Sequence, residues 1–334
     1  MYRTAACILL LLLVVPPGCR NAGGPAPVWK RATGFSVRSE PAVAGTRVYA
    51  GSDGLYCLDA ATGDIVWTFQ TYGVVRNSSV REAQGRIFFQ CGGLYCLDAG
   101  TGKLIWEFWQ DAWGDQTPAV DGGHVYAVMG RRLYCVRAES GVKVWEAAVG
   151  SAGAEPVAAG GRVYAGSRKI IFCIDAGSGR TLWKRTLGQW MGLPAVAGDR
   201  LYVGTPYKGV YCIDAQTGGI VWNQAVAAPV LTAPAVSTDA SRIYVNAVNM
   251  YCIDAATGEV VWTGDIRNRP TSPPVLAGGY LYIKSTNTMI SCIDPAGGTL
   301  LGQYGMPRGR LTIAGGHAYV ASPDRSVYCL EIGP

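Results

Sequence analysis

The stretch YCIDAATGEVVW, residues 251–262, has close copies at YCLDAATGDIVW (56–67), YCLDAGTGKLIW (95–106) and YCIDAQTGGIVW (211–222). Its cysteine recurs at eight positions, which are Cys57, Cys96, Cys135, Cys173, Cys212, Cys252, Cys292 and Cys329. Successive cysteines lie 37 to 40 residues apart. A repeat of this length predicts stacked supersecondary units, one for each copy.

Each copy contains four short segments that favour β-structure. In residues 40–70 these are PAVA, RVYAG, LYCLDA and DIVWTF, which are rich in β-branched and aromatic residues and are separated by turn clusters. Four-stranded units at this spacing are typical of propeller blades. We therefore predict an all-β fold, an eight-bladed β-propeller of four-stranded blades.

The two ends of the chain predict how the ring closes. The last copy, VYCLEIGP (327–334), stops before an outer-strand segment, and a spare PVWK (27–30) precedes the first complete copy. Trp29 stands 20 residues ahead of Tyr49, the same step as from Trp106 to Tyr126. We expect the N-terminal strand to complete the last blade, so that residues 27–334 form a single propeller.

The segment VYAGSDGLYCLDAATGDIVW (48–67) and its relatives resemble the pyrroloquinoline-quinone-type (PQQ-like) propeller repeat. The resemblance extends over residues 27–334 and implies the propeller fold. It says less about function. The family includes quinone-dependent alcohol and glucose dehydrogenases, and also non-catalytic envelope lipoproteins such as the propeller subunit of the bacterial outer-membrane barrel-assembly machinery.

One tryptophan recurs in most copies, at Trp29, Trp67, Trp106, Trp145, Trp183, Trp222 and Trp262. The resemblance implies that these side chains dock neighbouring blades, and a large apolar group on an outer strand would be buried well there. Copy seven, SCIDPAGGTLLG (291–302), lacks the tryptophan. We expect its blade to be the least regular.

The repeated cysteine is expected to fill a small buried slot. Equivalent sites on adjacent blades should lie about 10 Å apart, whereas a disulfide needs Cα atoms within about 7 Å. The same spacing argues against a metal site, and the chain has only two histidines, each after a glycine turn. We predict free thiols and no metal, with Cys91 as the accessible thiol.

Residues 1–19 have the pattern of an export signal. Arg3 precedes an apolar run, AACILLLLLVV (5–15), which is short for a transmembrane helix. Cys19 after Gly18 resembles the lipidation cysteine of bacterial lipoproteins. We expect a linker over 20–26 and a lipid anchor as the sole membrane attachment, on the periplasmic side of the outer membrane if the envelope is Gram-negative. A plainly cleaved secretory signal is the alternative.

Composition and motifs argue against several function classes. A net charge of +6 over 334 residues, without a Lys/Arg-rich run, argues against nucleic-acid binding. No GxSxG motif or Ser/His/Asp arrangement supports a hydrolase. The dehydrogenases that the repeat resembles carry adjacent cysteines and inserted calcium ligands, but this chain has no CC pair and its copies are nearly uniform. We expect no catalysis and no cofactor.

Function is expected where the copies differ, in the links between the outer strand of one blade and the inner strand of the next. The candidate partner-binding residues in these links are Arg38, Arg76, Asn77, Trp113, Asp115, Gln116, Glu155, Trp190, Arg269, Arg308 and Arg310. The arginines gather on copies seven, eight, one and two, and the acids on copies three and four. This asymmetry suits a partner's polar loop or a polyanionic glycan; ordinary solvated loops are the alternative explanation.

A second candidate surface is expected on the opposite side of the ring. The turn between the second and third segments is longer in copies five, seven and eight (GTPYKGVY, KSTNTMIS and ASPDRSVY).

Three functions follow from these observations. The leading one is a monomeric, non-catalytic envelope lipoprotein that is a scaffold for protein partners; the resemblance implies a role in outer-membrane protein assembly. The second is a small quinoprotein that binds pyrroloquinoline quinone. The third is a propeller that binds a glycan or small ligand through Trp113, Trp190 and the arginine sector.

Overall fold

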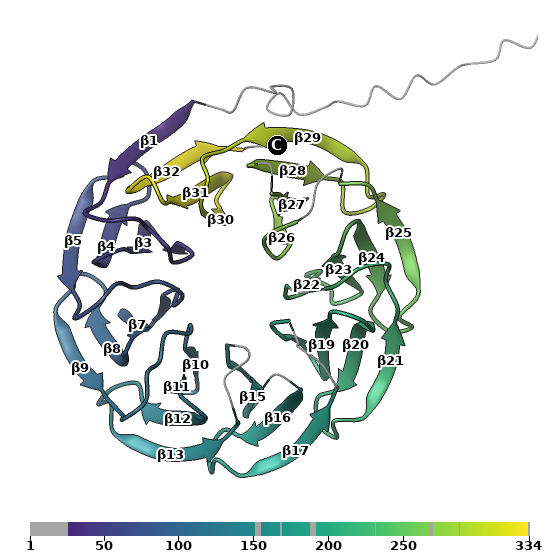
Figure 1. Ribbon diagram of the computed structural model, residues 1–334, viewed down its shortest axis with the longest axis horizontal. Helices are drawn as coiled ribbons and strands as arrows, with labels where there is room; N and C mark the ends of the chain where they lie inside the picture. The colour runs from purple at the N-terminus through teal and green to yellow at the C-terminus, as the bar shows by residue number, and fades with distance from the viewer. Residues whose placement is uncertain are drawn as a thin grey trace, which may run out of the picture.

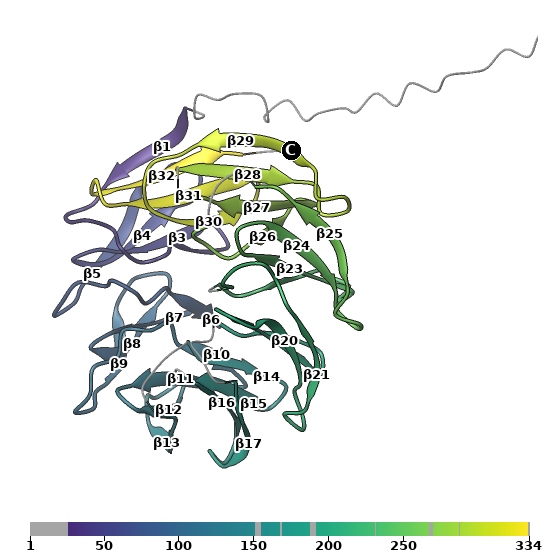
Figure 2. The same ribbon diagram turned by 45° about the vertical axis from the view of Figure 1, so that its right-hand side comes forward.

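A computed structural model describes residues 26–150, 155–167, 169–187, 192–230, 232–266, 270–286 and 288–332. Within these ranges, 32 strands form eight antiparallel sheets of four strands each. The sheets stand side by side in a ring, with the first strand of each blade towards the axis and the last at the circumference (Figure 1, Figure 2). The predicted eight-bladed β-propeller is confirmed.

The strands of blades one to four are β2 (Ala42–Ala44), β3 (Arg47–Gly51), β4 (Gly54–Asp59), β5 (Ile65–Gln70); β6 (Arg81–Ala83), β7 (Arg86–Cys91), β8 (Gly93–Asp98), β9 (Leu104–Phe108); β10 (Ala119–Asp121), β11 (His124–Met129), β12 (Arg132–Arg137), β13 (Lys143–Ala148); and β14 (Val157–Ala159), β15 (Arg162–Gly166), β16 (Ile170–Asp175), β17 (Thr181–Thr186). Those of blades five to eight are β18 (Ala195–Ala197), β19 (Arg200–Thr205), β20 (Gly209–Asp214), β21 (Ile220–Gln224); β22 (Ala235–Val236), β23 (Arg242–Asn246), β24 (Met250–Asp254), β25 (Val260–Gly264); β26 (Val275–Ala277), β27 (Tyr280–Lys284), β28 (Met289–Ile293), β29 (Leu300–Gly305); and β30 (Arg310–Ala314), β31 (His317–Ser322), β32 (Ser326–Glu331), with β1 (Pro27–Ala32).

The N-terminal strand closes the ring. β1 pairs antiparallel with β32, the third strand of blade eight, and becomes its outer strand (Figure 1). Trp29 lies opposite Cys329 in this pair, as Trp67 lies opposite Cys57 in blade one. The closure predicted from the two ends of the chain is confirmed.

Each repeated tryptophan contacts the next blade. The indole N–H of Trp29 donates to the carbonyl of Ala60 at 3.0 Å, and the other six donate to equivalent carbonyls at 2.9 to 3.1 Å. The ring of Trp29 packs against Gly63, whose φ is +72°; a Cβ there would lie 2.5 Å from the indole. This contact explains why the TG turn and the tryptophan recur together.

Blade seven forms the same four-stranded sheet as the other blades, so the missing tryptophan does not change its number of strands. Position 302, opposite Cys292, is glycine where other blades have tryptophan. A tryptophan there would face the turn between the third and fourth strands of blade eight, and this turn does not exist because β1 comes from the other end of the chain. Tyr304 and Met306 instead pack against Leu330 and Ile332.

The hydrophobic core is divided into clusters between neighbouring blades. The cluster between blades one and two, for example, contains Tyr49, Cys57 and Trp67 with Phe89 and Tyr95. All nine cysteines in the described ranges are buried, and no disulfide joins any two of them. Burial raises the pKa of Cys57 to about 11 and that of Cys96 to about 12.

Cys91 corrects one prediction, because it is only 3% exposed. The link after β9 folds over it, with backbone hydrogen bonds of 2.9 Å in both directions between Gly92 and Gly114. Gly73 approaches the thiol from the preceding link. The link conformation, which the repeat pattern does not encode, therefore covers this thiol.

Candidate functional site at the channel mouth

The links and the turns between second and third strands lie on one face of the ring, which we call the link face. The amide of Val75 in a link donates to the carbonyl of Ser52 in such a turn at 2.9 Å, and the amide of Thr271 donates to that of Lys284 at 2.8 Å. The first strand of a blade runs away from this face and the second returns to it. The second candidate surface was therefore assigned to the wrong side, since both sets of loops share one face.

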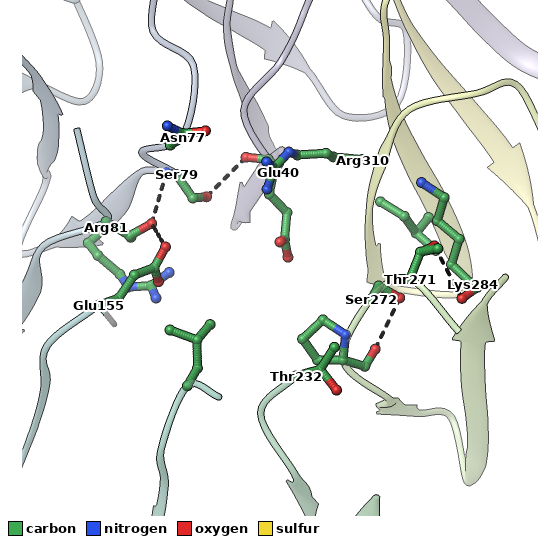
Figure 3. A pocket seen from close by; sticks show the side chains of 14 residues that line it. Glu40, Asn77, Ser79, Arg81, Glu155, Thr232, Thr271, Ser272, Lys284 and Arg310 are labelled. Carbon is green, nitrogen blue, oxygen red and sulfur yellow. Dashed lines mark hydrogen bonds between the residues drawn. The ribbon is translucent and has the colours of Figure 1, made fainter. Parts of the chain in front are cut away.

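The residues immediately before the inner strands surround a central cavity of about 510 Å³ (Figure 3). Most blades contribute the residue two positions before the inner-strand residue that lies opposite the tyrosine or phenylalanine of the second strand. These residues are Glu40, Ser79, Thr117, Glu155, Leu193, Pro273 and Arg310. Polar side chains therefore cover the arc from blade eight to blade four, and apolar ones occupy blades five and seven.

Hydrogen bonds connect this polar arc from blade to blade. The hydroxyl of Ser79 donates to the carbonyl of Glu40 at 3.0 Å, and its amide donates to the hydroxyl of Thr117 at 3.0 Å. The Thr117 hydroxyl donates to Oε1 of Glu155 at 2.7 Å. Four successive blades thus present a fixed polar wall, which favours preorganised contacts with a ligand or partner.

Five charged side chains face the central cavity, Glu40, Arg81, Glu155, Lys284 and Arg310. Among the described residues none of them forms an ion pair within 4.0 Å. Figure 3 shows Arg81 beside Glu155, with Lys284 across the cavity.

The enclosure of this cavity shifts the pKa of three of these groups. Burial, and then the charge of Glu155, raises the pKa of Glu40, although its side chain keeps contact with water. Burial raises the pKa of Glu155 against the Thr117 hydrogen bond and the charge of Arg81. Burial lowers the pKa of Lys284, and Arg310 adds to the effect. Charges held without close counterions are typical of sites that receive a charged or polar group.

A second cavity of about 410 Å³, which we call the side cavity, adjoins the first. It lies at the link-face end of blade two, between the links before and after that blade, and Asn77 lines both cavities. The links supply Arg76, Asn77, Trp113 and Asp115. The Asn77 amide donates to Oδ2 of Asp115 at 2.7 Å. Four candidate residues chosen from the sequence therefore meet around one cavity.

An aromatic shelf extends outwards from the side cavity. It consists of Tyr72, Trp109 and Trp113, of which Tyr72 is 87% and Trp113 66% exposed. The rings of Tyr72 and Trp109 meet edge to face, with centroids 6.1 Å apart. Trp109 also packs against buried Tyr95, which holds the shelf on blade two.

The remaining candidate residues lie elsewhere. Arg38 and Arg308 are exposed and line neither cavity, and Gln116 is half-buried with an Oε1 that has no donor within the described ranges. Cys19, Trp190 and Arg269 lie outside the described residues. Glu155 and Arg310 line the central cavity, with Asn77.

Three charged residues of the central cavity, Glu40, Arg81 and Lys284, are not among the candidates from the sequence. Candidates such as Arg38 stand three residues before the proline position of a link, and the cavity is lined two residues further along the chain. Arg81 stands opposite Phe88 at the first position of β6, where blades one, three, five and six have alanine. That contrast was a usable signal. Lys284 is the last residue of β27, and its position in the repeat does not indicate that it lines the cavity.

The described residues contain no cluster of three or more His, Cys, Asp or Glu side chains that could hold a metal ion. No helix long and apolar enough to cross a membrane occurs in the part of the chain that the structure describes.

Comparisons with solved structures show the same fold in proteins of different function. BamB from Moraxella catarrhalis has a TM-score of 0.74 and 18% identity, over 92% of this chain and 97% of that one. A europium-containing methanol dehydrogenase gives 0.70 and 16%, over 91% and 84%. The computationally designed Ika8 protein gives 0.78 and 12%, over 93% and 100%.

No curated protein sequence matches this chain significantly. A family model described as outer membrane protein assembly factor BamB matches residues 19–93, 90–170, 167–262 and 246–333. Because these spans cover nearly all of the propeller, the chain belongs to this BamB family of PQQ-like β-propellers.

Proposed function

We propose that this chain is a non-catalytic propeller of the cell envelope that binds protein partners through its link face. The observation that carries the proposal is the aromatic shelf with Arg76 beside it. Solvent-exposed tryptophan, tyrosine and arginine side chains in one cluster are the residue types that dominate binding energy at protein interfaces. Family membership supports the finer proposal of a role in outer-membrane protein assembly.

The proposal includes a signal over residues 1–19, lipid attachment at Cys19 and a linker over 20–26. The protein is then a monomer held at the outer membrane by lipid alone, with its propeller on the periplasmic side. Replacement Cys19→Ser should move it from the membrane to the soluble fraction and abolish incorporation of labelled palmitate. Retention in the membrane would overturn the lipid anchor and leave the link face open to test.

Affinity capture from native membranes tests the scaffold function. Wild type should retain an envelope protein partner in stoichiometric amount, and Tyr72→Ser should lose it. Tyr207→Ser is the matched control, because Tyr207 is 79% exposed in the turn between β19 and β20 on the same face. Equal capture by wild type and Tyr72→Ser, or equal loss in both variants, would contradict the proposed surface.

A bound quinone is the enzymatic alternative. The methanol dehydrogenase similarity reflects fold alone, and none of the nine described cysteines forms the vicinal disulfide that the family's quinone enzymes carry. We derive no reaction step through a quinone. An absorption band stoichiometric with the captured protein would overturn the non-catalytic proposal.

A further inference from the structure

The side cavity has the size and shape of a small-molecule site. Its volume of about 410 Å³ lies within the usual range of ligand pockets, roughly 300–1,000 Å³. Two links and the end of β7 enclose it, and its floor is Gln90 and Cys91. These residues are held rigidly, because the backbone of Gly92 pairs with that of Gly114 across the floor.

The floor contains an unsatisfied hydrogen-bond acceptor. Gln90 is 1% exposed, and its Nε2 donates to the carbonyl of Val128 at 3.3 Å. Its Oε1 has no donor among the described residues. A buried acceptor without a partner costs free energy, so a ligand that donates a hydrogen bond there gains more than it would at an exposed amide.

The other residues around the side cavity complement this acceptor: Trp113 forms its wall, and Arg76, Asn77 and Asp115 form its rim. The Trp113 indole packs against Gly92 and leaves most of its surface exposed beside the cavity. Asp115 accepts from Asn77, and Arg76 supplies a guanidinium on the same rim. Among the described residues Arg76 and Asp115 form no ion pair within 4.0 Å.

A rim that holds both a cation and an anion disfavours a ligand of either net charge. It favours a neutral molecule with donors and acceptors around its edge and an apolar face for the indole. A pyranose ring has this chemistry, because its C–H groups form an apolar face and its hydroxyls donate and accept. We propose that the side cavity binds one neutral sugar unit, with its C–H face on Trp113 and its hydroxyls at Gln90 Oε1, Asp115 and Arg76.

This inference goes beyond the scaffold function, and it shares Trp113 and Arg76 with the surface proposed for the protein partner. The test uses the full-length protein in detergent, with glucose, galactose, mannose and N-acetylglucosamine as probes in saturation-transfer NMR. At least one sugar should receive saturation through its ring C–H protons. Trp113→Ala should weaken binding of that sugar by roughly threefold to tenfold. Asp115→Asn should weaken it as well, since a charge-assisted hydrogen bond is lost. Tyr207→Ala, the matched exposed aromatic, should leave it unchanged.

A variant at the floor separates binding from folding. Gln90→Leu removes the unpartnered acceptor together with the donor to the Val128 carbonyl, so it should abolish sugar binding while the melting temperature changes little. Absence of saturation for all four sugars would overturn the proposal. Sugar binding that Trp113→Ala and Gln90→Leu leave intact would overturn it as well. Loss of a captured protein partner in Trp113→Ala, without any sugar binding, would assign the cavity to a protein side chain instead.

Discussion

At the residue scale, the docking tryptophans carry much of the stability between blades. Trp106 is 9% exposed and bonds the carbonyl of Ala138 in the next blade. Trp106→Ala should lower the free energy of unfolding by about 3–5 kcal/mol, because it leaves a cavity and an unpaired carbonyl. Exposed Trp113→Ala is the control and should change it by less than about 1 kcal/mol in urea unfolding. Similar losses in both variants would contradict the docking role.

The glycine under each tryptophan can be tested with a matched pair. Gly63 and Gly45 both have positive φ, but a Cβ on Gly63 would meet the Trp29 indole and one on Gly45 meets nothing within 4 Å. Gly45→Ala should cost about 1–2 kcal/mol from the backbone alone. Gly63→Ala should cost a further 1–3 kcal/mol or so from overpacking. Equal shifts of the unfolding midpoint would show that the contact with the indole is unimportant.

The buried thiols should be inert in the native protein. Burial raises the pKa of Cys57 to about 11 and that of Cys135 to about 12, and the thiolate is the reactive form. Iodoacetamide at pH 8 should modify none of the nine described cysteines until denaturant is added, as read by peptide mass spectrometry. Rapid native labelling of Cys91 would show that the link after β9 opens.

At the element scale, the pairing of β1 with β32 holds the ring closed. Lys30 lies opposite Tyr328 across this pair, near the periphery of blade eight. Lys30→Cys with Tyr328→Cys should form a disulfide, since opposite Cα atoms in such a pair lie within about 5.5 Å. The bond should stabilise the protein by about 2–4 kcal/mol. The same variant in reductant is the control, and an unchanged melting temperature after oxidation would mean that ring closure does not limit stability.

The repeat pattern predicts strands better than it predicts links. Asp59, Gly63 and Trp67 recur because nearly every blade needs the same turn and the same tryptophan contact with its neighbour. The repeat length and the closure of the ring could therefore be deduced from the sequence alone. The sequence of the link after β9 does not follow the repeat pattern. Its fold over Cys91 depends on Gly92 and Gly114, and its burial of that thiol could not be deduced. That the links and the turns between second and third strands share one face follows from the alternating strand directions alone, so this feature was predictable from the sequence.

At the scale of the whole molecule, the central cavity combines charges from blades one, two, four, seven and eight. Their positions depend on how far each inner strand begins from the axis, which is a property of the closed ring. For this reason Glu155 and Arg310 could be chosen from the links, whereas Lys284 at the end of β27 became visible only in the assembled propeller.

The same assembly predicts an unusual dependence of stability on pH. The pKa of Glu155 is raised in the folded state, chiefly by burial, so its ionisation opposes folding. The protonated Glu155 carboxyl therefore contributes its full stabilisation below the unfolded pKa, near 4.3. This stabilisation disappears as the pH rises through the folded pKa. Glu155→Gln keeps an acceptor for the Thr117 hydroxyl and removes the charge. Its melting temperature should therefore equal that of wild type at pH 4 and match or exceed it at pH 7.

Thr117→Val is the control for the hydrogen bond, and it should be less stable than wild type at both pH values. A deficit of Glu155→Gln that grows towards pH 7 would show that Arg81 and Arg310 stabilise the carboxylate more than burial opposes it.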